Sequence, residues 1–229
     1  MSAPTATTRE LLAILGELDA LHAWRGWHWW PDADPFEVIT GSILVQNTAW
    51  TNVERALDRL REARALTPSA MATLPEAVLE ELVRPSGQYR QKARKLRAFL
   101  VLAERHGGLD ALLALPAATL REELLATWGI GPETADAIAV YAAHKPAFVI
   151  DAYTMRLFAR LGVGPVASRD YATWQAFFVA NLPEDRDLWA RYHALIVMHC
   201  KHLCRKHSPK CGECTLAARC LFAHSERTP

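Results

Sequence analysis

Four cysteines near the C-terminal end of this 229-residue chain are spaced closely enough to bind one inorganic centre. They follow the pattern C-x6-C-x2-C-x5-C and are Cys204, Cys211, Cys214 and Cys220. A fifth cysteine, Cys200, precedes them as a spare, and the chain before it contains none. Four thiolates suit either an iron–sulfur cluster or a tetrahedral zinc ion, so the residue types alone leave both centres open.

Basic side chains gather around the first two of these cysteines. They are Lys201, Arg205, Lys206 and Lys210, with no acidic residue among them before Glu213. The whole chain has a net charge of only +1, so its composition demands no polyanionic partner. A metal centre that shapes a basic loop instead predicts a local surface for phosphate.

Composition limits the class of protein. A hydrophobic fraction of 51% is enough for one large domain or two small ones. No apolar run is long enough to cross a bilayer, and the first ten residues lack the regions of a secretion signal. We expect an intracellular, cytoplasmic protein with no membrane partner, where clustered cysteines bind metal more often than they form disulfides.

The hydrophobic pattern is helical over nearly the whole chain. Leu11, Ile14 and Leu18 recur at helical spacing behind a capping box formed by Thr7 and Glu10. Further helices are expected after the N-cap Asp34 and over residues 152–162, 169–181 and 187–200. Alternating patterns are absent apart from a brief stretch at 147–150, so the predicted fold class is all-α.

A short turn between two predicted helices has the pattern of a helix–hairpin–helix. Gly129, Ile130 and Gly131 follow a helix that ends near Trp128, and Pro132 opens the next helix, expected to reach Ala143. Glycines let a backbone turn sharply and approach another backbone closely, which suits a DNA phosphate. The alternative interpretation is a tight corner between helices with no ligand.

An aspartate follows the second of these helices at the end of an apolar run. Asp151 comes directly after Phe148, Val149 and Ile150, whose backbone should be buried. A carboxylate in that position can activate water or stabilise a cationic transition state. It can also serve as the N-cap of the helix starting at Ala152, and the two roles are compatible.

Taken in order, these motifs resemble the endonuclease III superfamily of helix–hairpin–helix DNA glycosylases. The resemblance runs from about Asp34 to Cys220 and includes the hairpin, the Val/Ile-Asp pair and the spacing of the four cysteines. It implies that Asp151 is the catalytic carboxylate and that the cysteines hold a 4Fe–4S cluster. It also implies that Gly129, Ile130 and Gly131 hold a DNA phosphate, with a monovalent cation at the hairpin carbonyls.

One departure from the family pattern concerns the hairpin lysine. Members that also cleave the strand carry a lysine whose amine attacks the sugar, and this chain has Glu133 there. A carboxylate cannot form a Schiff base, so we expect a monofunctional glycosylase with weak or absent lyase activity. An acid in the first turn of a helix is also favourable on its own account.

Tryptophans are crowded in the first fifty residues. Trp29, Trp30 and Pro31 precede one predicted helix, and Trp50 follows it. Indole faces can hold a flipped base and favour cationic alkylpurines, although some of these rings must simply pack. This pattern, together with Glu133, resembles the 3-methyladenine DNA glycosylase branch, and implies that these residues line the substrate pocket.

Two glutamines are the candidates to fill the space that a flipped base leaves. Gln46 corresponds to one such plug by superfamily resemblance, and Gln88 occupies the position of an apolar wedge in the turn Ser86-Gly87-Gln88-Tyr89. The cationic residues that follow this turn are Lys92, Arg94, Lys95 and Arg97. Because they fall on more than one helical face, we expect most of them to be ordinary solvated charges.

The resemblance implies two helical lobes with the active site in the cleft between them. Residues 31–144 would form a six-helix barrel with the helix–hairpin–helix, and residues 1–30 plus 145–229 the iron–sulfur cluster lobe. The expected protein is a monomer that hydrolyses alkylated purines from double-stranded DNA containing a damaged base. Alternatives are a glycosylase for oxidised pyrimidines, a catalytically inactive iron–sulfur DNA-binding protein, and a zinc module, which the long first cysteine spacing disfavours.

Overall fold

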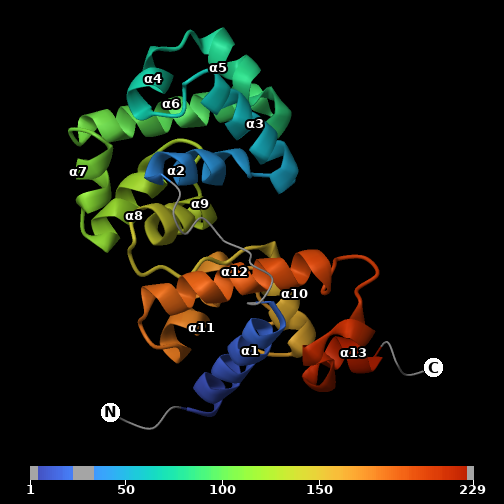
Figure 1. Cartoon of the computed structure of the whole chain (residues 1–229). Helices are drawn as coiled ribbons and strands as arrows, with labels where there is room; N and C mark the ends of the chain where they lie inside the picture. The colour runs from blue at the N-terminus through green and yellow to red at the C-terminus, as the bar shows by residue number, and fades with distance from the viewer. Residues whose placement is uncertain (1–4, 23–33, 226–229) are drawn as a thin grey trace. The chain divides into compact units, whose positions relative to one another are not determined.

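A computed structural model describes residues 5–22 and 34–225, and every regular element in these ranges is a helix (Figure 1). The predicted all-α fold class is therefore confirmed. None of the helices in these ranges is long and apolar enough to cross a membrane. Contacts within the chain divide it into two compact units, residues 1–29 with 146–229 and residues 30–145. We call them the cysteine unit and the hairpin unit and describe each separately.

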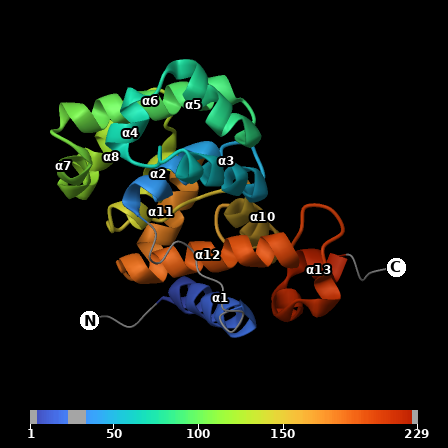
Figure 2. The same cartoon turned by 45° about the horizontal axis from the view of Figure 1, so that its top comes forward.

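The cysteine unit combines the first helix with the C-terminal third of the chain. Its α-helices are α1 (Ala6–His22), α10 (Ala152–Leu161), α11 (Tyr171–Asn181), α12 (Arg186–His202) and α13 (Leu221–Ser225). The cysteine loop adds two short 3-10 helices, η4 (Cys211–Glu213) and η5 (Thr215–Arg219). Helix α12 packs against both α1 and α10, and Figure 2 shows the three together.

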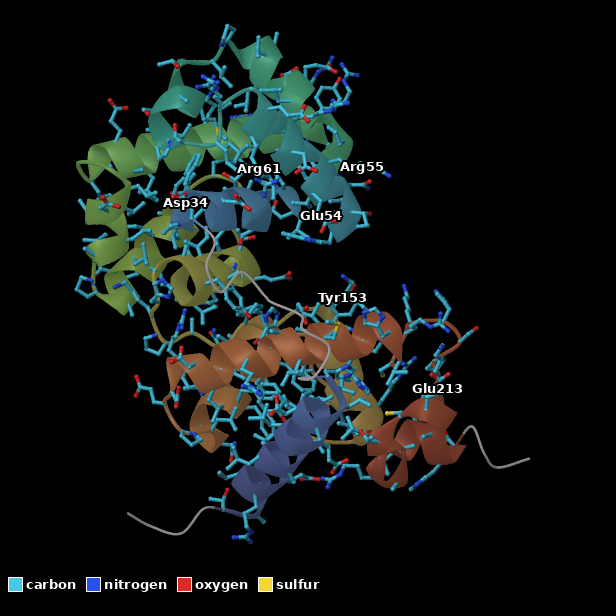
Figure 3. The ribbon with its side chains drawn as sticks, viewed as in Figure 1. Asp34, Glu54, Arg55, Arg61, Tyr153 and Glu213 are labelled. Atoms are coloured by element: carbon cyan, nitrogen blue, oxygen red, sulfur yellow. The ribbon has the colours of Figure 1, made fainter. Side chains whose placement is uncertain are left out.

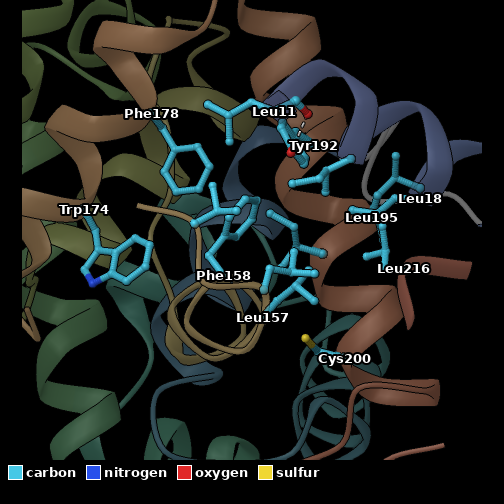
Figure 4. Packing of buried hydrophobic residues seen from close by; sticks show 14 of the residues in the cluster. Leu11, Leu18, Leu157, Phe158, Trp174, Phe178, Tyr192, Leu195, Cys200 and Leu216 are labelled. Atoms are coloured by element: carbon cyan, nitrogen blue, oxygen red, sulfur yellow. Dashed lines mark hydrogen bonds between the residues drawn. The ribbon is translucent and has the colours of Figure 1, made fainter. Parts of the chain in front are cut away.

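An aromatic core holds this unit together (Figure 4). Phe148 stacks on Phe178 with ring centroids 4.2 Å apart, and Phe158 meets Phe178 edge to face at 4.8 Å. The buried Tyr192 hydroxyl donates to the carbonyl of Leu11 at 2.8 Å, which ties α12 to α1. Phe148 lies three residues before Asp151, so this packing fixes the position of the Asp151 carboxylate.

The hairpin unit contains the helices α2 to α9. They are α2 (Pro35–Leu44), α3 (Trp50–Glu62), α4 (Pro68–Thr73), α5 (Glu76–Val83), α6 (Tyr89–Arg105), α7 (Leu109–Ala114), α8 (Ala117–Ala126) and α9 (Pro132–Ala137), with a 3-10 turn η2 (Arg84–Ser86). Helix α2 is buried on nearly all sides and packs against α3, α6 and α9. An apolar surface all round is typical of a central helix.

Helix α2 starts as local capping rules predict. The Asp34 carboxylate accepts from the backbone N–H of Phe36 at 2.8 Å, with Pro35 at the first helical position, as predicted. Arg61 at the end of α3 is bonded to Glu37 in the first turn of α2, which links the two helices (Figure 3).

The helix after the hairpin is not one regular α-helix. Helix α9 ends at Ala137 and continues as a π-helical segment, η3 (Ile138–Ala142), in which all five residues are buried. The N–H of Ala143 bonds to the carbonyl of Ile138, five residues back, so the last turn is wider than predicted. If α9 and η3 are counted as one helix, six helices in the described part of the hairpin unit have eight or more residues. The other two, α4 and α7, have six residues each.

Candidate functional site

Asp151 is the N-cap of α10, and the segment before it is extended but belongs to no sheet. The N–H of Ile150 donates to the Tyr171 hydroxyl at 3.3 Å, and Gln175 Nε2 donates to the carbonyl of Phe148 at 2.9 Å. Side chains of α11 therefore satisfy the buried backbone that a neighbouring strand would otherwise pair. This arrangement lets a short apolar segment end at a carboxylate.

The two oxygens of the Asp151 carboxylate have different surroundings. Oδ1 accepts from Thr154 twice, from the backbone N–H at 2.7 Å and from the hydroxyl at 2.9 Å. Oδ2 lies 3.6 Å from His193 Nε2 of α12, and both side chains are largely buried. Oδ1 thus caps the helix, and Oδ2 is the oxygen left to act on a proton.

Burial acts to raise the pKa of Asp151, but His193 and the two Thr154 bonds outweigh it and lower the pKa below its usual value. The carboxylate is therefore ionised at neutral pH, as a base or an electrostatic stabiliser must be. Burial is the main cause that raises the pKa of the neighbouring Tyr153 (Figure 3), and the negative charge of Asp151 is the second. Asp151 thus combines a capping role with a retained negative charge.

The hairpin glycines differ in conformation. Gly129 has a φ of 84°, in the left-handed region, whereas Gly131 has a φ of −94°. The Ile130 N–H donates to the carbonyl of Thr127 at 3.1 Å and its side chain is buried. The Gly131 carbonyl accepts from Ala135 as α9 begins. Only Gly129 therefore needs to be glycine for conformational reasons.

Gln46 lies against this hairpin. Its Nε2 donates to the carbonyl of Gly129 at 3.2 Å and to the Thr134 hydroxyl at 2.9 Å. Its Oε1 accepts from the ammonium of Lys95, on α6. Both N–H donors of the amide are used within the protein. The structure thus brings together a residue before α3, a residue of α6 and the hairpin.

Three of the four cationic residues early in α6, Lys92, Lys95 and Arg97, are wholly or partly buried, so the expectation that most of the four are solvated charges is wrong. Lys92 is 1% exposed and donates to the carbonyl of Ser86. Arg94 stacks 4.1 Å over the ring of Trp128, and Arg97 donates to carbonyls at the end of α4. Helical spacing correctly spreads these side chains over several faces, but neighbouring segments cover the faces of all except the exposed Arg94.

The four predicted ligand cysteines line one pocket. Apolar side chains, among them Leu157, Leu161 and Leu216, form much of its remaining wall. The Cys200 thiol and then the Arg160 guanidinium lower the pKa of Cys204 to about 6 against the effect of burial. Among the described residues, no three metal-binding side chains are grouped closely enough for a single ion. The donor set and the shared, largely apolar cavity fit a multi-atom cluster held by thiolates.

Two arginines of α10 donate hydrogen bonds to the backbone of the cysteine loop. Arg160 Nη1 lies 3.2 Å from Cys204 Sγ and donates to the carbonyl of Arg205 at 2.8 Å, while Nη2 donates to that of Lys206 at 3.2 Å. Arg156 donates to the carbonyl of Cys204 at 3.1 Å. Guanidinium groups thereby fix the backbone of the loop that carries the exposed basic residues.

A pair of buried histidines also contacts the cysteine site, through His199. His199 Nε2 lies 3.5 Å from Cys214 Sγ, and His199 Nδ1 lies 3.1 Å from His22 Nε2. Burial and then His22 lower the pKa of His199 to about 4, so its ring is neutral at neutral pH. A neutral ring can donate to sulfur through Nε2 while Nδ1 accepts from His22.

The remaining predicted residues are less closely linked. Lys201, Arg205 and Lys206 are exposed, but Lys210 pairs with Glu213 (Figure 3) at 3.2 Å, so the loop is less basic than the sequence indicated. Gln88 and Glu133 are exposed and Trp50 is half-buried. The three residues Trp29, Trp30 and Pro31 lie outside the described residues.

A model of the HhH-GPD superfamily of base excision DNA repair proteins matches residues 40–172. This range is more than half of the chain and includes Gln46, the hairpin and Asp151. The chain belongs to the HhH-GPD superfamily. It is a DNA glycosylase of that superfamily, and the resemblance to endonuclease III drawn from the motifs is confirmed.

Relatives within the superfamily cover most of the chain. A candidate DNA repair glycosylase of Methanocaldococcus jannaschii is 41% identical over 197 residues, 85% of this chain and 89% of the relative. Endonuclease III of Thermotoga maritima is 32% identical over 194 residues, 83% of this chain and 84% of its own length.

Solved structures of the superfamily have the same fold. The Helicobacter pylori 3-methyladenine DNA glycosylase bound to 1,N6-ethenoadenine is 30% identical, with a TM-score of 0.74 over 83% of this chain and 97% of that one. A non-covalent endonuclease III–DNA complex has a TM-score of 0.82 over 98% of this chain and 100% of that one; at 23% identity, it supports the fold alone.

Several residues that surround the predicted HhH-GPD site carried no motif signal. His193, His199 and Arg160 lie at helical positions where a histidine or arginine is ordinary. The one available signal for Lys95 is its spacing: it lies three residues after Lys92, and so near the same face of the helix that follows the predicted wedge turn. Only the packing of one helix against another shows what each of them contacts.

Proposed function

We propose that this protein is a monofunctional DNA glycosylase that excises alkylated purines such as 3-methyladenine from double-stranded DNA. The observation that carries the proposal is the Asp151 carboxylate, ionised by its surroundings and with Oδ2 not used as a helix cap. Oδ2 would accept a proton from the attacking water, or stabilise the cationic sugar as the base departs. The products would be a free base and an abasic site.

Glu133 supports hydrolysis over strand cleavage. It stands in the first turn of α9, where members with lyase activity carry the attacking lysine, and a carboxylate cannot form a Schiff base with the sugar. Lyase activity would then be weak or absent. Sodium borohydride should leave the enzyme–DNA complex untrapped, and efficient covalent trapping would contradict the monofunctional assignment.

Support for an alkylpurine substrate comes from the tryptophans and from one relative. Trp29, Trp30, Pro31 and Trp50, with Glu133, would line the pocket, because indole faces favour cationic bases by roughly 0.5–2 kcal/mol. The Helicobacter pylori 3-methyladenine DNA glycosylase, solved with 1,N6-ethenoadenine, is 30% identical. The 32% identity to an endonuclease III favours the second candidate function, excision of oxidised pyrimidines.

The DNA contacts we propose come from both units. Gly129, Ile130 and Gly131 would hold a phosphate, with a monovalent cation at the hairpin carbonyls, and Gln88 would fill the space left by the flipped base. Gln46 would contribute to DNA binding next to the hairpin. Lys201, Arg205, Lys206 and Lys210 would add phosphate contacts on the cysteine loop, and the protein would act as a monomer.

We also propose that Cys204, Cys211, Cys214 and Cys220 hold a 4Fe–4S cluster. Four thiolates around one largely apolar cavity support this centre over a single zinc ion. When bound, the cluster would have no open coordination site and would shape the basic loop. Purified protein should be yellow-brown and contain about four irons per chain; a colourless zinc protein would contradict the assignment.

One panel of duplexes tests the substrate. Wild type and Asp151→Asn are incubated with duplexes containing 3-methyladenine, 1,N6-ethenoadenine, 7-methylguanine, hypoxanthine or thymine glycol, and base release is measured. Wild type should release the alkylated purines and the variant should not. Release of thymine glycol alone would favour the oxidised-pyrimidine function, and binding without release of any base would favour an inactive DNA-binding protein.

A further inference from the structure

Lys95 has a role that its position in a charged helix did not indicate. It is half-buried, and its side chain runs along the backbone of Gly129. A methyl group built onto Gly129 would lie 2.9 Å from Lys95 Cδ and from Cε, far inside normal contact distance. Lys95 therefore packs directly against the first glycine of the hairpin.

The ammonium of Lys95 ends at Gln46 and not at the hairpin itself. It donates to Gln46 Oε1, which leaves the two N–H groups of the amide facing Gly129 and Thr134. The amide could rotate by half a turn, but the carbonyl oxygen would then face the Gly129 carbonyl and the N–H groups would face the cation. A cation on one side therefore selects the orientation in which Gln46 supports the hairpin.

We propose that Lys95 is a positioning residue that holds Gln46 against the hairpin, so that Gln46 acts on DNA through the hairpin's conformation. This rests on the proposed function only in assuming that the hairpin contacts DNA. The bonds from Gln46 reach both ends of the turn, the carbonyl of Gly129 and the hydroxyl of Thr134 in α9. Loss of the Lys95 contact frees the amide and loosens a segment whose backbone must be rigid to bind phosphate.

The structure offers a matched set of variants. Lys95→Met removes the ammonium but keeps an unbranched side chain against Gly129, and Gln46→Ala removes the amide. Arg90→Met is the control because Arg90 is also a cation of α6, with a side chain that is 76% exposed and paired with Glu80. Thermal unfolding of each variant checks that the fold is retained, and Lys95→Gln serves if Lys95→Met does not fold.

Hydrogen exchange of the DNA-free protein gives the first measurement. Amides of residues 129–135 should exchange faster in Lys95→Met and in Gln46→Ala, and at the wild-type rate in Arg90→Met. The double variant should exchange no faster than Gln46→Ala alone. Unchanged hairpin exchange in Lys95→Met would overturn the proposal, and this measurement holds even if no damaged base is ever released.

Duplex binding gives the second measurement, made over a range of salt concentrations. Lys95→Met should weaken binding by about tenfold, the size expected for one charge-assisted hydrogen bond. It should have no further effect in the Gln46→Ala background. The slope of log affinity against log salt should stay unchanged, whereas a direct phosphate contact would reduce its magnitude by about 0.9.

The outcomes separate this proposal from the family expectation for Gln46 and from the proposed function. Tighter binding by Lys95→Met would mean that Lys95 restrains a plug that must leave the hairpin, and would overturn the proposal. A reduced salt slope would make Lys95 a phosphate contact, and would overturn it too. If the wild type binds duplexes but releases no base, the proposed function fails while the exchange and binding results still decide the role of Lys95.

Discussion

Arg160 in the cysteine unit and Lys95 in the hairpin unit both fix a functional backbone segment, but by different means. The planar guanidinium of Arg160 contacts one sulfur and two carbonyls of the cysteine loop directly. The Lys95 ammonium contacts Gln46, whose amide then holds the hairpin. A fork of several donors can bind several acceptors at once, whereas a point charge needs an intermediary to do so. In its polar contacts, the hairpin is therefore held less directly than the cysteine loop.

The greatest effect should come from Asp151, the catalytic residue that we propose in the cysteine unit. Asp151→Asn removes the charge but keeps the shape, and should slow base release about 100-fold or more with duplex affinity unchanged. Lys95→Met should do the reverse, weakening affinity without slowing release from the saturated enzyme. Single-turnover base release and equilibrium binding measure the two effects. Base release by Asp151→Asn at the wild-type rate would refute the assignment of Asp151.

Asp151 also predicts a pH dependence. Because its pKa is lowered in the folded protein, its charge stabilises the fold above the pKa of the unfolded chain. That contribution is lost only as the pH falls through the lower, folded value. Base release should therefore show no acid limb from Asp151 near about pH 6, where a carboxyl buried without partners would titrate. A pH–rate profile measures this.

The next prediction tests the direct support of the cysteine loop. Arg160→Lys keeps the charge but cannot reach the sulfur and both carbonyls together, so it should lower the iron content and the unfolding temperature. Removing iron from the wild type with a chelator should lower that temperature as well. Arg169→Lys is the control, since Arg169 is an exposed residue of the same unit. If Arg160→Lys retained all its iron, the several contacts of the guanidinium would not be needed, and a single ammonium would support the cysteine loop equally well.

A further prediction separates the two hairpin glycines. Gly129→Ala combines an unfavourable φ of 84° with a clash against Lys95, and should destabilise the protein by about 1–2 kcal/mol. At Gly131 an added methyl meets nothing within 4 Å, so Gly131→Ala should change stability by less than about 0.5 kcal/mol. Chemical denaturation measures both. Equal losses would show that Lys95 does not constrain the turn.

The last prediction concerns Lys92, which the hairpin unit buries beside Lys95. Burial and then Lys95 lower the pKa of Lys92 to about 8. The unfolded chain therefore binds more protons above that pH, and the free energy of unfolding should rise with pH up to the usual pKa of lysine. Lys92→Met should lack this rise. Denaturation of both proteins at about pH 7 and about pH 10 measures it; parallel behaviour would mean that Lys92 keeps an ordinary pKa.

Local rules predicted much of the fold. Asp34 and Asp151 cap α2 and α10 as expected, because an aspartate side chain reaches its own helix without help from elsewhere. Local rules also failed where two residues competed for one role. The N-terminal cap of α1 comes from the hydroxyl of Thr5, which accepts from Thr8 N–H at 3.0 Å, and not from the predicted Thr7.

The superfamily and the all-α class could be predicted from the sequence, since each depends on residues that are close along the chain, whereas the ligand set stays a prediction. The cysteines are an example: four thiols within seventeen residues predict a shared site, and all four line one pocket. Packing between helices was needed to show that α6 supports the hairpin and that His193 helps to lower the pKa of Asp151, because those contacts join residues about 35 to 50 positions apart. A periodic pattern states which face a side chain occupies, and packing alone determines what that face meets.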